Sequence, residues 1–356
     1  MTDKKLSQRP IAIWLLVGVS MIMIQVLLGG ITRLTGSGLS ITRWDLVTGS
    51  LPPMDDTQWE QAFEGYKQTA QFKTINSSFT VSDFKYIYFW EWLHRVWARF
   101  IGIVFIIPFI IFILQKRFQK WMVNPLLVLF GLGALQGLVG WIMVATGLHG
   151  SNLLYVRHYE LATHFMLALI VLCYTFWFAM KMLVKEEYRI NSKPLYKLSI
   201  SIIVLLTVQL IYGAFMAGLK AGTFAPTWPD INTAIIPSGD ILFKKSPSII
   251  NIFENEIMIQ FIHRGLAYIL FIMICLWTYR AYKNANPDSY RDKLFNKTKW
   301  LPLAVVSLQI VLGVFTVLHS GIKQELLWLG VSHQFVAMML LLVMVWESYI
   351  VRINKR

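Results

Sequence analysis

Four histidines at matched positions are the residues of this chain best suited to chemistry. His94 and His164 lie in its first half, His263 and His333 lie in its second, and both pairs are related by an offset of 169 residues. Each lies inside an apolar stretch, where an imidazole without a partner or a task is costly. Two facing imidazoles can supply both axial nitrogens of a heme iron. The pattern therefore favours two bis-histidine heme sites, His94 with His164 and His263 with His333.

Simpler explanations exist for any single imidazole, which can hydrogen-bond to a neighbouring helix or line a proton path. Zinc fits poorly, because each half offers two histidines without nearby thiolates or a clear third ligand. Cys173 and Cys275 both lie in apolar stretches and are interpreted as packing residues. The remaining histidines fall in loops or at the ends of apolar stretches and are interpreted as surface residues: His149, His158 and His319.

One acidic residue distinguishes the two halves. Glu91 precedes His94 by three positions, which places both on one helical face, whereas Gln260 holds the equivalent place in the second half. A buried carboxylate beside a heme can act as a general base or stabilise positive charge on a substrate. This assigns reactivity to the first half and electron transfer to the second. The alternative is that Glu91 merely pairs with Arg95 or Arg99.

One arginine directly follows the first histidine of each half. Arg95 and Arg264 could pair with heme propionates, because guanidinium and carboxylate groups form strong, well-oriented contacts. The alternative is that both side chains extend to lipid headgroups.

Eight apolar stretches must position these residues. The chain has 356 residues, of which 56% are hydrophobic and only 15% charged. Crossing a bilayer takes about 20 mostly apolar residues, so the composition predicts an all-α integral membrane protein. The predicted spans cover residues 11–31, 87–114, 122–146, 157–183, 199–219, 257–279, 301–319 and 326–351.

The net charge of +14 indicates membrane topology and does not indicate a nucleic-acid partner. Basic residues gather near both termini and in every second connection, at 116–117, 181–197 and 280–299. Because basic segments stay on the cytoplasmic side, both termini are expected there, and the long segments 32–86 and 220–256 outside. We expect a multi-pass protein of a bacterial inner membrane, surrounded by lipid.

The odd-numbered spans share a second motif, Gln-x-x-x-Gly. Since each half holds four spans with the same landmarks in the same order, the sequence predicts two parallel-repeat four-helix bundles, residues 1–184 and 185–356. The glycines are expected to let helices or a macrocycle approach closely. The motif occurs at Gln25 and Gly29, Gln136 and Gly140, Gln209 and Gly213, and Gln309 and Gly313.

Together these features resemble the heme A synthase family over nearly the whole chain. The resemblance is carried by the motif from Glu91 to Arg95, the glycine-rich run 29–40 and the repeated histidines. It implies oxidation of a methyl group of heme O to a formyl group by successive hydroxylations, giving heme A for cytochrome oxidase. It also implies that His263 and His333 bind a heme b cofactor, that His94 and His164 face the substrate heme, and that Glu91 is catalytic.

The resemblance also bears on partners. Segment 32–86 lacks the cysteine pair that some family members carry, so the chain is similar to the long-loop branch. Its Trp44 and Trp59 are expected to form a lid, to contact assembly machinery, or to belong to an interfacial aromatic belt. A heme O synthase and an electron carrier are expected partners. The electron acceptor, the oxygen source and the formation of a homo-oligomer are left open.

The chemical route and two other functions also remain open. Either one histidine leaves so that oxygen can bind, or electrons are removed through the ring and water attacks with Glu91 as base. A di-heme membrane cytochrome that exchanges electrons with quinone would use the same four histidines, and Glu91 is the residue that separates it from a synthase. A parallel-repeat transporter would show no Soret absorbance.

Overall fold

The computed structural model describes residues 7–43, 50–149, 154–285 and 292–352. Within these ranges eight helical segments are long and apolar enough to cross a bilayer, which confirms an all-α membrane protein with eight spans. The long helices are α1 (Arg9–Leu34), α4 (Val81–Leu114), α5 (Lys120–His149), α6 (His158–Leu183), α7 (Lys193–Gly218), α10 (Glu256–Asn284), α12 (Leu301–Leu318) and α13 (Lys323–Ile350). The short helices are α2 (Asp56–Lys67), α3 (Ala70–Thr74), α8 (Gly239–Leu242), α9 (Asn251–Glu254) and α11 (Lys293–Thr298), the last leading directly into α12.

Helix α4 starts at Val81, earlier than the predicted span start at residue 87. The reason is a reciprocal cap. The N–H of Thr80 donates to the Asp83 carboxylate at 2.9 Å, and the N–H of Asp83 donates to the Thr80 hydroxyl at 3.3 Å. Because such a cap satisfies N–H groups that have no partner within the helix, α4 extends beyond the predicted span. His94 consequently lies further from the start of its helix than the sequence suggested.

The chain divides into two compact units, residues 17–171 and residues 172–356 together with the first sixteen residues. Helices α1 and α6 each contribute to both units. The predicted bundles 1–184 and 185–356 divide the chain by sequence repeat, and this division stays a prediction, as does the cytoplasmic placement of the termini.

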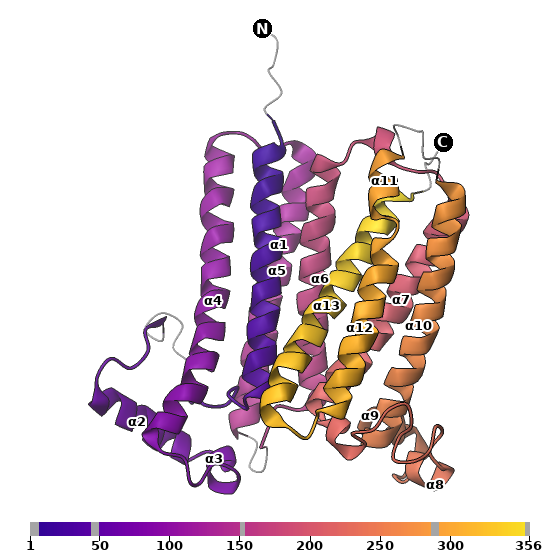
Figure 1. Cartoon of the computed structure of the whole chain (residues 1–356). Helices are drawn as coiled ribbons and strands as arrows, with labels where there is room; N and C mark the ends of the chain where they lie inside the picture. Colours follow the sequence, from indigo (N-terminus) through magenta and orange to yellow (C-terminus); the bar gives the residue numbers. More distant parts are fainter. Residues whose placement is uncertain (1–6, 44–49, 150–153, 286–291, 353–356) are drawn as a thin grey trace. The chain divides into compact units, whose positions relative to one another are not determined.

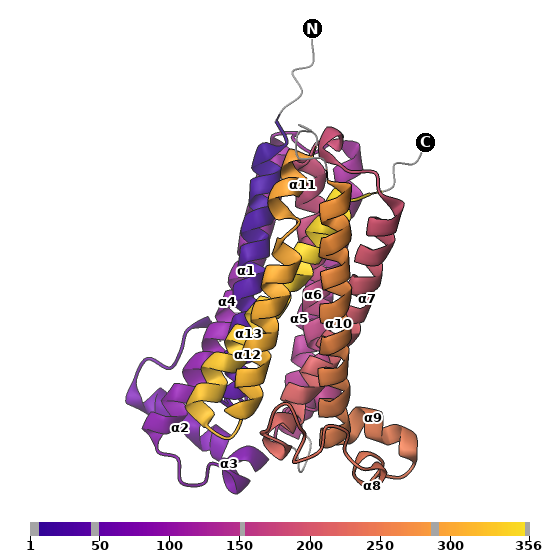
Figure 2. The same cartoon turned by 45° about the vertical axis from the view of Figure 1, so that its right-hand side comes forward.

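In the C-terminal unit, four long helices form a closed ring. Helices α7 and α12 each pack against both α10 and α13, and Figures 1 and 2 show these four side by side. The indole of Trp277 on α10 donates to the Ser199 hydroxyl on α7 at 2.8 Å, which ties that pair of helices. Since α10 and α13 have the same two neighbours, they stand diagonally across the bundle, and side chains on their inner faces point toward one another.

In the unit formed by residues 17–171, α4 lies between α1 and α5. The indole of Trp97 on α4 donates to the Met21 carbonyl on α1 at 2.9 Å. Phe105 on α4 stacks on Phe130 of α5, with ring centroids 6.4 Å apart. Helix α5 in turn meets α6 through a contact between Gln136 and a histidine that belongs to the site described below. The order of these contacts matches the order α7, α10, α12, α13 in the other unit.

The segment between α1 and α4 folds onto the beginning of α4. Phe63 and Tyr66 of α2 are buried against Phe84 of α4, and burial raises the pKa of Tyr66. Trp59 packs edge-on against Phe84 and Tyr88, at centroid distances of 6.4 and 5.1 Å. Trp59 is thus a half-buried member of a small aromatic core, whereas Trp44, the other expected lid residue, lies outside the described residues.

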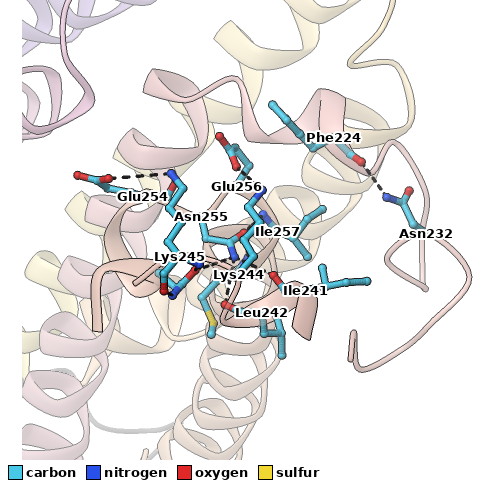
Figure 3. Close-up of polar contacts among 12 residues, drawn as sticks. Phe224, Asn232, Ile241, Leu242, Lys244, Lys245, Glu254, Asn255, Glu256 and Ile257 are labelled. Atoms are coloured by element: carbon cyan, nitrogen blue, oxygen red, sulfur yellow. Dashed lines mark hydrogen bonds and ion pairs between the residues drawn. The ribbon is translucent and has the colours of Figure 1, made fainter. Parts of the chain in front are cut away.

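The segment between α7 and α10 is held by the buried side chain of Asn255, shown in Figure 3. Asn255, which has no exposed surface, donates through Nδ2 to the carbonyls of Ile241 and Leu242 at 2.8 and 3.1 Å. Its Oδ1 accepts the N–H groups of Ile257 and Met258, at 3.0 and 3.3 Å, and so caps α10. One side chain therefore fixes both this segment and the start of the helix that carries His263.

Candidate functional site

The structure brings the predicted histidines together in pairs. His94 on α4 and His164 on α6 are close enough to interact electrostatically, and the same holds for His263 on α10 and His333 on α13. The second pair comes from the diagonal helices of its bundle, which is the arrangement that lets two imidazoles face each other across a core. All four rings are half-buried.

Each imidazole is held by the glutamine of the Gln-x-x-x-Gly motif in the neighbouring odd-numbered span. The sequence identified this motif but not its partner, and the equal number of motifs and histidines was the signal that could have linked them. The Nε2-to-Nε2 distances are 3.2 Å for Gln25 and His94, 3.3 Å for Gln136 and His164, 3.4 Å for Gln209 and His263, and 3.2 Å for Gln309 and His333.

The glycine of each motif lies against the same ring. A Cβ added to the glycine would lie 2.9 Å from Cε1 of the histidine at Gly140 and Gly313, 3.2 Å at Gly29 and 3.4 Å at Gly213. Distances below 3.0 Å force the neighbouring group to move. The predicted close approach at these glycines is therefore an approach of the imidazole to the neighbouring helix.

The donor set fits a heme iron in both halves. The Nδ1 atoms of His164, His263 and His333 are buried without a hydrogen-bond partner. A buried imidazole that protein groups do not fully satisfy has capacity for another partner. Among the described residues no three His, Cys, Asp or Glu side chains gather into a metal-binding group. Paired neutral imidazoles suit the axial positions of a porphyrin iron, which binds the ring nitrogen that carries the lone pair.

Glu91 lies in a cradle of donors one helical turn from His94. Its Oε2 accepts the N–H and the hydroxyl of Ser40, both at 2.7 Å, and the N–H of Ile41 at 2.9 Å. Its Oε1 forms an ion pair with Arg95, and the side chain is almost completely buried. The Arg95 pairing that the sequence allowed as an alternative is thus present, although in a buried setting.

A local turn brings Ser40 to Glu91. Helix α1 ends with the Gly36 N–H bonded to the Arg33 carbonyl at 3.2 Å and the Ser37 N–H bonded to the Thr32 carbonyl at 2.9 Å. This closing pattern requires a left-handed residue, and Gly36 has φ of +74°. The glycine-rich run therefore reverses the chain so that its last residues reach α4, a role for Ser40 that the sequence analysis missed.

Gln260 occupies the equivalent place in the second half, but it donates to the backbone where Glu91 accepts from it. Its Nε2 donates to the Ala221 carbonyl at 3.0 Å, and its Oε1 accepts from Arg264 at 2.5 Å. The acid of the first half faces loop N–H groups, and the amide of the second half faces a loop C=O group. The exchange of Glu for Gln therefore matches the backbone that each side chain meets.

Both arginines are bound to carbonyl groups of the segment that precedes their helix. Arg95 donates to the Ile41 and Arg43 carbonyls at 3.2 and 3.3 Å. Arg264 donates to the carbonyls of Asp230 and Thr227, both at 2.7 Å. These contacts hold each guanidinium group beside that preceding segment.

The other histidines and the cysteines lie apart from these contacts. His319 contacts the Phe315 carbonyl through Nδ1 at 2.9 Å and Glu325 through Nε2 at 3.5 Å. The ring of His158 lies against that of Tyr159 at a tilt, with centroids 3.9 Å apart, and the side chain of His149 lies outside the described residues. The two cysteines, Cys173 and Cys275, are half-buried free thiols.

Comparisons with known proteins cover the whole helical region. Residues 12–345 match the family model described as cytochrome oxidase assembly protein. A protein from Bradyrhizobium diazoefficiens named heme A synthase is 40% identical over 341 residues, which are 96% of this chain and 91% of that relative. Proteins of the same name from Flavobacterium psychrophilum and Flavobacterium johnsoniae are 38% and 36% identical, covering 94% and 97% of this chain and 96% and 98% of those relatives.

Proposed function

Because this chain belongs to the cytochrome oxidase assembly protein family, we propose that it oxidises a methyl group of heme O to a formyl group, through successive hydroxylations, and so supplies heme A to cytochrome oxidase. The observation that carries the proposal is the presence of two imidazole pairs, each with its own glutamine contacts, in a chain that resembles heme A synthases over nearly its full length. The di-heme cytochrome that exchanges electrons with quinone finds no support in these comparisons.

The two pairs take different tasks in this proposal. His263 and His333 are the axial ligands of a resident heme b, which supplies an electron-transfer centre when bound. His94 and His164 hold the substrate heme. They lie beside Glu91, an acid, whereas the equivalent position of the second half carries Gln260. The iron supplies the oxidising power, because no side chain can oxidise an unactivated methyl group. The protein's part is to bind, orient and polarise.

For Glu91, the geometry supports an electrostatic role over that of a base. Three donors occupy Oε2 and Arg95 occupies Oε1, so taking up a proton would break at least one charge-assisted contact. A carboxylate fixed in this way is preorganised to stabilise positive charge that develops on the substrate. Arg95 and Arg264, positioned by loop carbonyls, are proposed to face heme propionates.

The proposal also places the chain among partners. The protein is a multi-pass membrane protein, and its bacterial relatives fit an inner-membrane location. An enzyme that makes heme O must deliver the substrate, and an electron carrier must remove the electrons released by the oxidation.

The test is the heme profile of the purified full-length protein, expressed with and without an enzyme that makes heme O. We expect heme A only when heme O is supplied, and heme b in both preparations. Heme b alone in both preparations, from folded and reducible protein, would refute the synthase activity and favour an electron-transfer cytochrome. A preparation without Soret absorbance would refute both.

A further inference from the structure

The glutamines of the first half make a second contact with their histidines. Nε2 of Gln25 lies 3.2 Å from the His94 carbonyl oxygen, and Nε2 of Gln136 lies 3.2 Å from the His164 carbonyl oxygen. A carbonyl oxygen can only accept a hydrogen bond. This contact therefore fixes which way each amide faces, with its NH₂ group toward the histidine and its oxygen away.

The fixed amide determines which electrons of the ring it contacts. One N–H serves the carbonyl, and the other faces the ring nitrogens: Gln136 Nε2 lies 3.3 Å from His164 Nε2, and Gln25 Nε2 lies 3.2 Å from Nε2 and 3.3 Å from Nδ1 of His94. A nitrogen that receives an N–H must offer its lone pair. That lone pair is also what an imidazole gives to iron. In the first half, the glutamine amide and a heme iron thus compete for the same nitrogen lone pair.

Among the described residues, the glutamines of the second half make no such contact with the backbone carbonyl of their histidine. The Oε1 atoms of all four glutamines have no hydrogen-bond partner, but Gln209 and Gln309 meet only the rings of His263 and His333, at 3.4 and 3.2 Å, and no carbonyl contact holds their amides. Such an amide can turn and accept the ring N–H. An accepted N–H orients a ligating imidazole and strengthens its bond to a metal.

We propose that Gln25 and Gln136 are internal competitors for the iron-binding nitrogens of His94 and His164, which makes heme binding in the first half reversible. When heme enters, each amide gives up its ring contact; when heme leaves, the amide takes the lone pair again. The inference rests on the proposed function, in which the first half must release its product while the second half retains its cofactor.

The experiment measures heme release from the full-length protein loaded with ferric heme b, using excess apomyoglobin as the acceptor. A faster and a slower phase are expected, and a His164→Ala variant identifies the phase that belongs to the first half. Gln25→Met and Gln136→Met keep side-chain length but remove the donor. Both should slow the first-half phase by about fivefold, the equivalent of one hydrogen bond of about 1 kcal/mol.

Gln309→Met is the matched control, because its amide lacks the carbonyl anchor. It should leave the first-half phase unchanged. An unchanged or faster first-half phase in both Gln25→Met and Gln136→Met would overturn the proposal. Loss of first-half heme in both variants would also overturn the proposal, provided that the Soret band of the second half shows that the protein is folded. Heme A formation in the preceding test, combined with unaltered release here, would reject the competitor role alone and leave the synthase activity intact.

Discussion

Ser40 and Glu91 are joined by two hydrogen bonds of 2.7 Å, one from the backbone N–H and one from the hydroxyl of Ser40. This contact ties the glycine-rich run after α1 to the helix that carries His94. The turn at Gly36 therefore helps to position the donors that Glu91 on α4 accepts from. A change in the loop is therefore expected to act on the site through Glu91.

Replacing Glu91 with Gln should abolish most heme A formation while heme b stays bound. The amide cannot accept from all the donors that surround position 91, and it carries no charge to stabilise the substrate, so we expect a loss of about 100-fold. The measurement is the extracted heme profile in the presence of heme O. Ser40→Ala removes only the hydroxyl and should cause a smaller loss. Wild-type heme A from Glu91→Gln would remove Glu91 from the reaction.

The reverse exchange in the second half, Gln260→Glu, should destabilise the protein. Gln260 has no exposed surface, and its Nε2 donates to the Ala221 carbonyl. A carboxylate there would face a carbonyl oxygen without a donor between them, at a cost of about 2 kcal/mol. Thermal unfolding of the heme-loaded protein measures this cost. An unchanged transition would show that the loop shifts to offer an N–H group.

Alanine in place of the four motif glycines should have graded effects on heme binding. Gly140 and Gly313 leave the least room, at 2.9 Å from Cε1 of the histidine, and Gly213 leaves the most, at 3.4 Å. We expect Gly140→Ala and Gly313→Ala to displace the ring and lower heme content strongly, and Gly213→Ala to be nearly neutral.

The matched control for this series is Gly133→Ala, also on α5, where an added Cβ meets nothing within 4 Å. It should keep full heme content and gain up to about 1 kcal/mol from helix propensity. The Soret absorbance per polypeptide measures the whole series. Equal effects at Gly140 and Gly133 would contradict the ring contact.

Asn255 should be the most sensitive residue of the segment between α7 and α10. Its side chain bonds to two loop carbonyls and caps α10, so Asn255→Ala is expected to cost about 2 to 3 kcal/mol. The exposed Asn232 makes one side-chain bond, to the Phe224 carbonyl at 2.8 Å, as Figure 3 shows. Asn232→Ala should cost less than about 1 kcal/mol. Proteolysis rates of the two variants compare the costs, and similar rates would argue against a fixed segment between α7 and α10.

The two histidine pairs should separate by heme content. His263→Ala or His333→Ala should remove the resident heme b, whether or not heme O is present. His94→Ala should retain heme b and lose heme A formation. Pyridine hemochrome spectra and extracted hemes measure both outcomes. Loss of the resident heme from His94→Ala in folded protein would reverse the assignment of the two halves.

The sequence by itself determined the class of the protein and the identity of its chemical groups. Eight apolar stretches can be satisfied only as spanning helices, since the bilayer core leaves no other partner for backbone N–H and C=O groups. The repeated offset between His94 and His263 predicted the ligands, because an imidazole in an apolar segment is costly without a partner or a task. Glu91 stood out for the same reason, as an acid where the other half carries Gln260.

Tertiary structure decided what those groups touch. Spacing along one helix relates Glu91 to His94, but it carries no information about Ser40, which reaches Glu91 only because Gly36 turns the chain after α1. The contact of each histidine with a glutamine joins two different helices, and its donor direction depends on a backbone carbonyl that only packing brings near. Such contacts depend on how helices are placed side by side, and periodicity within one helix does not specify that placement.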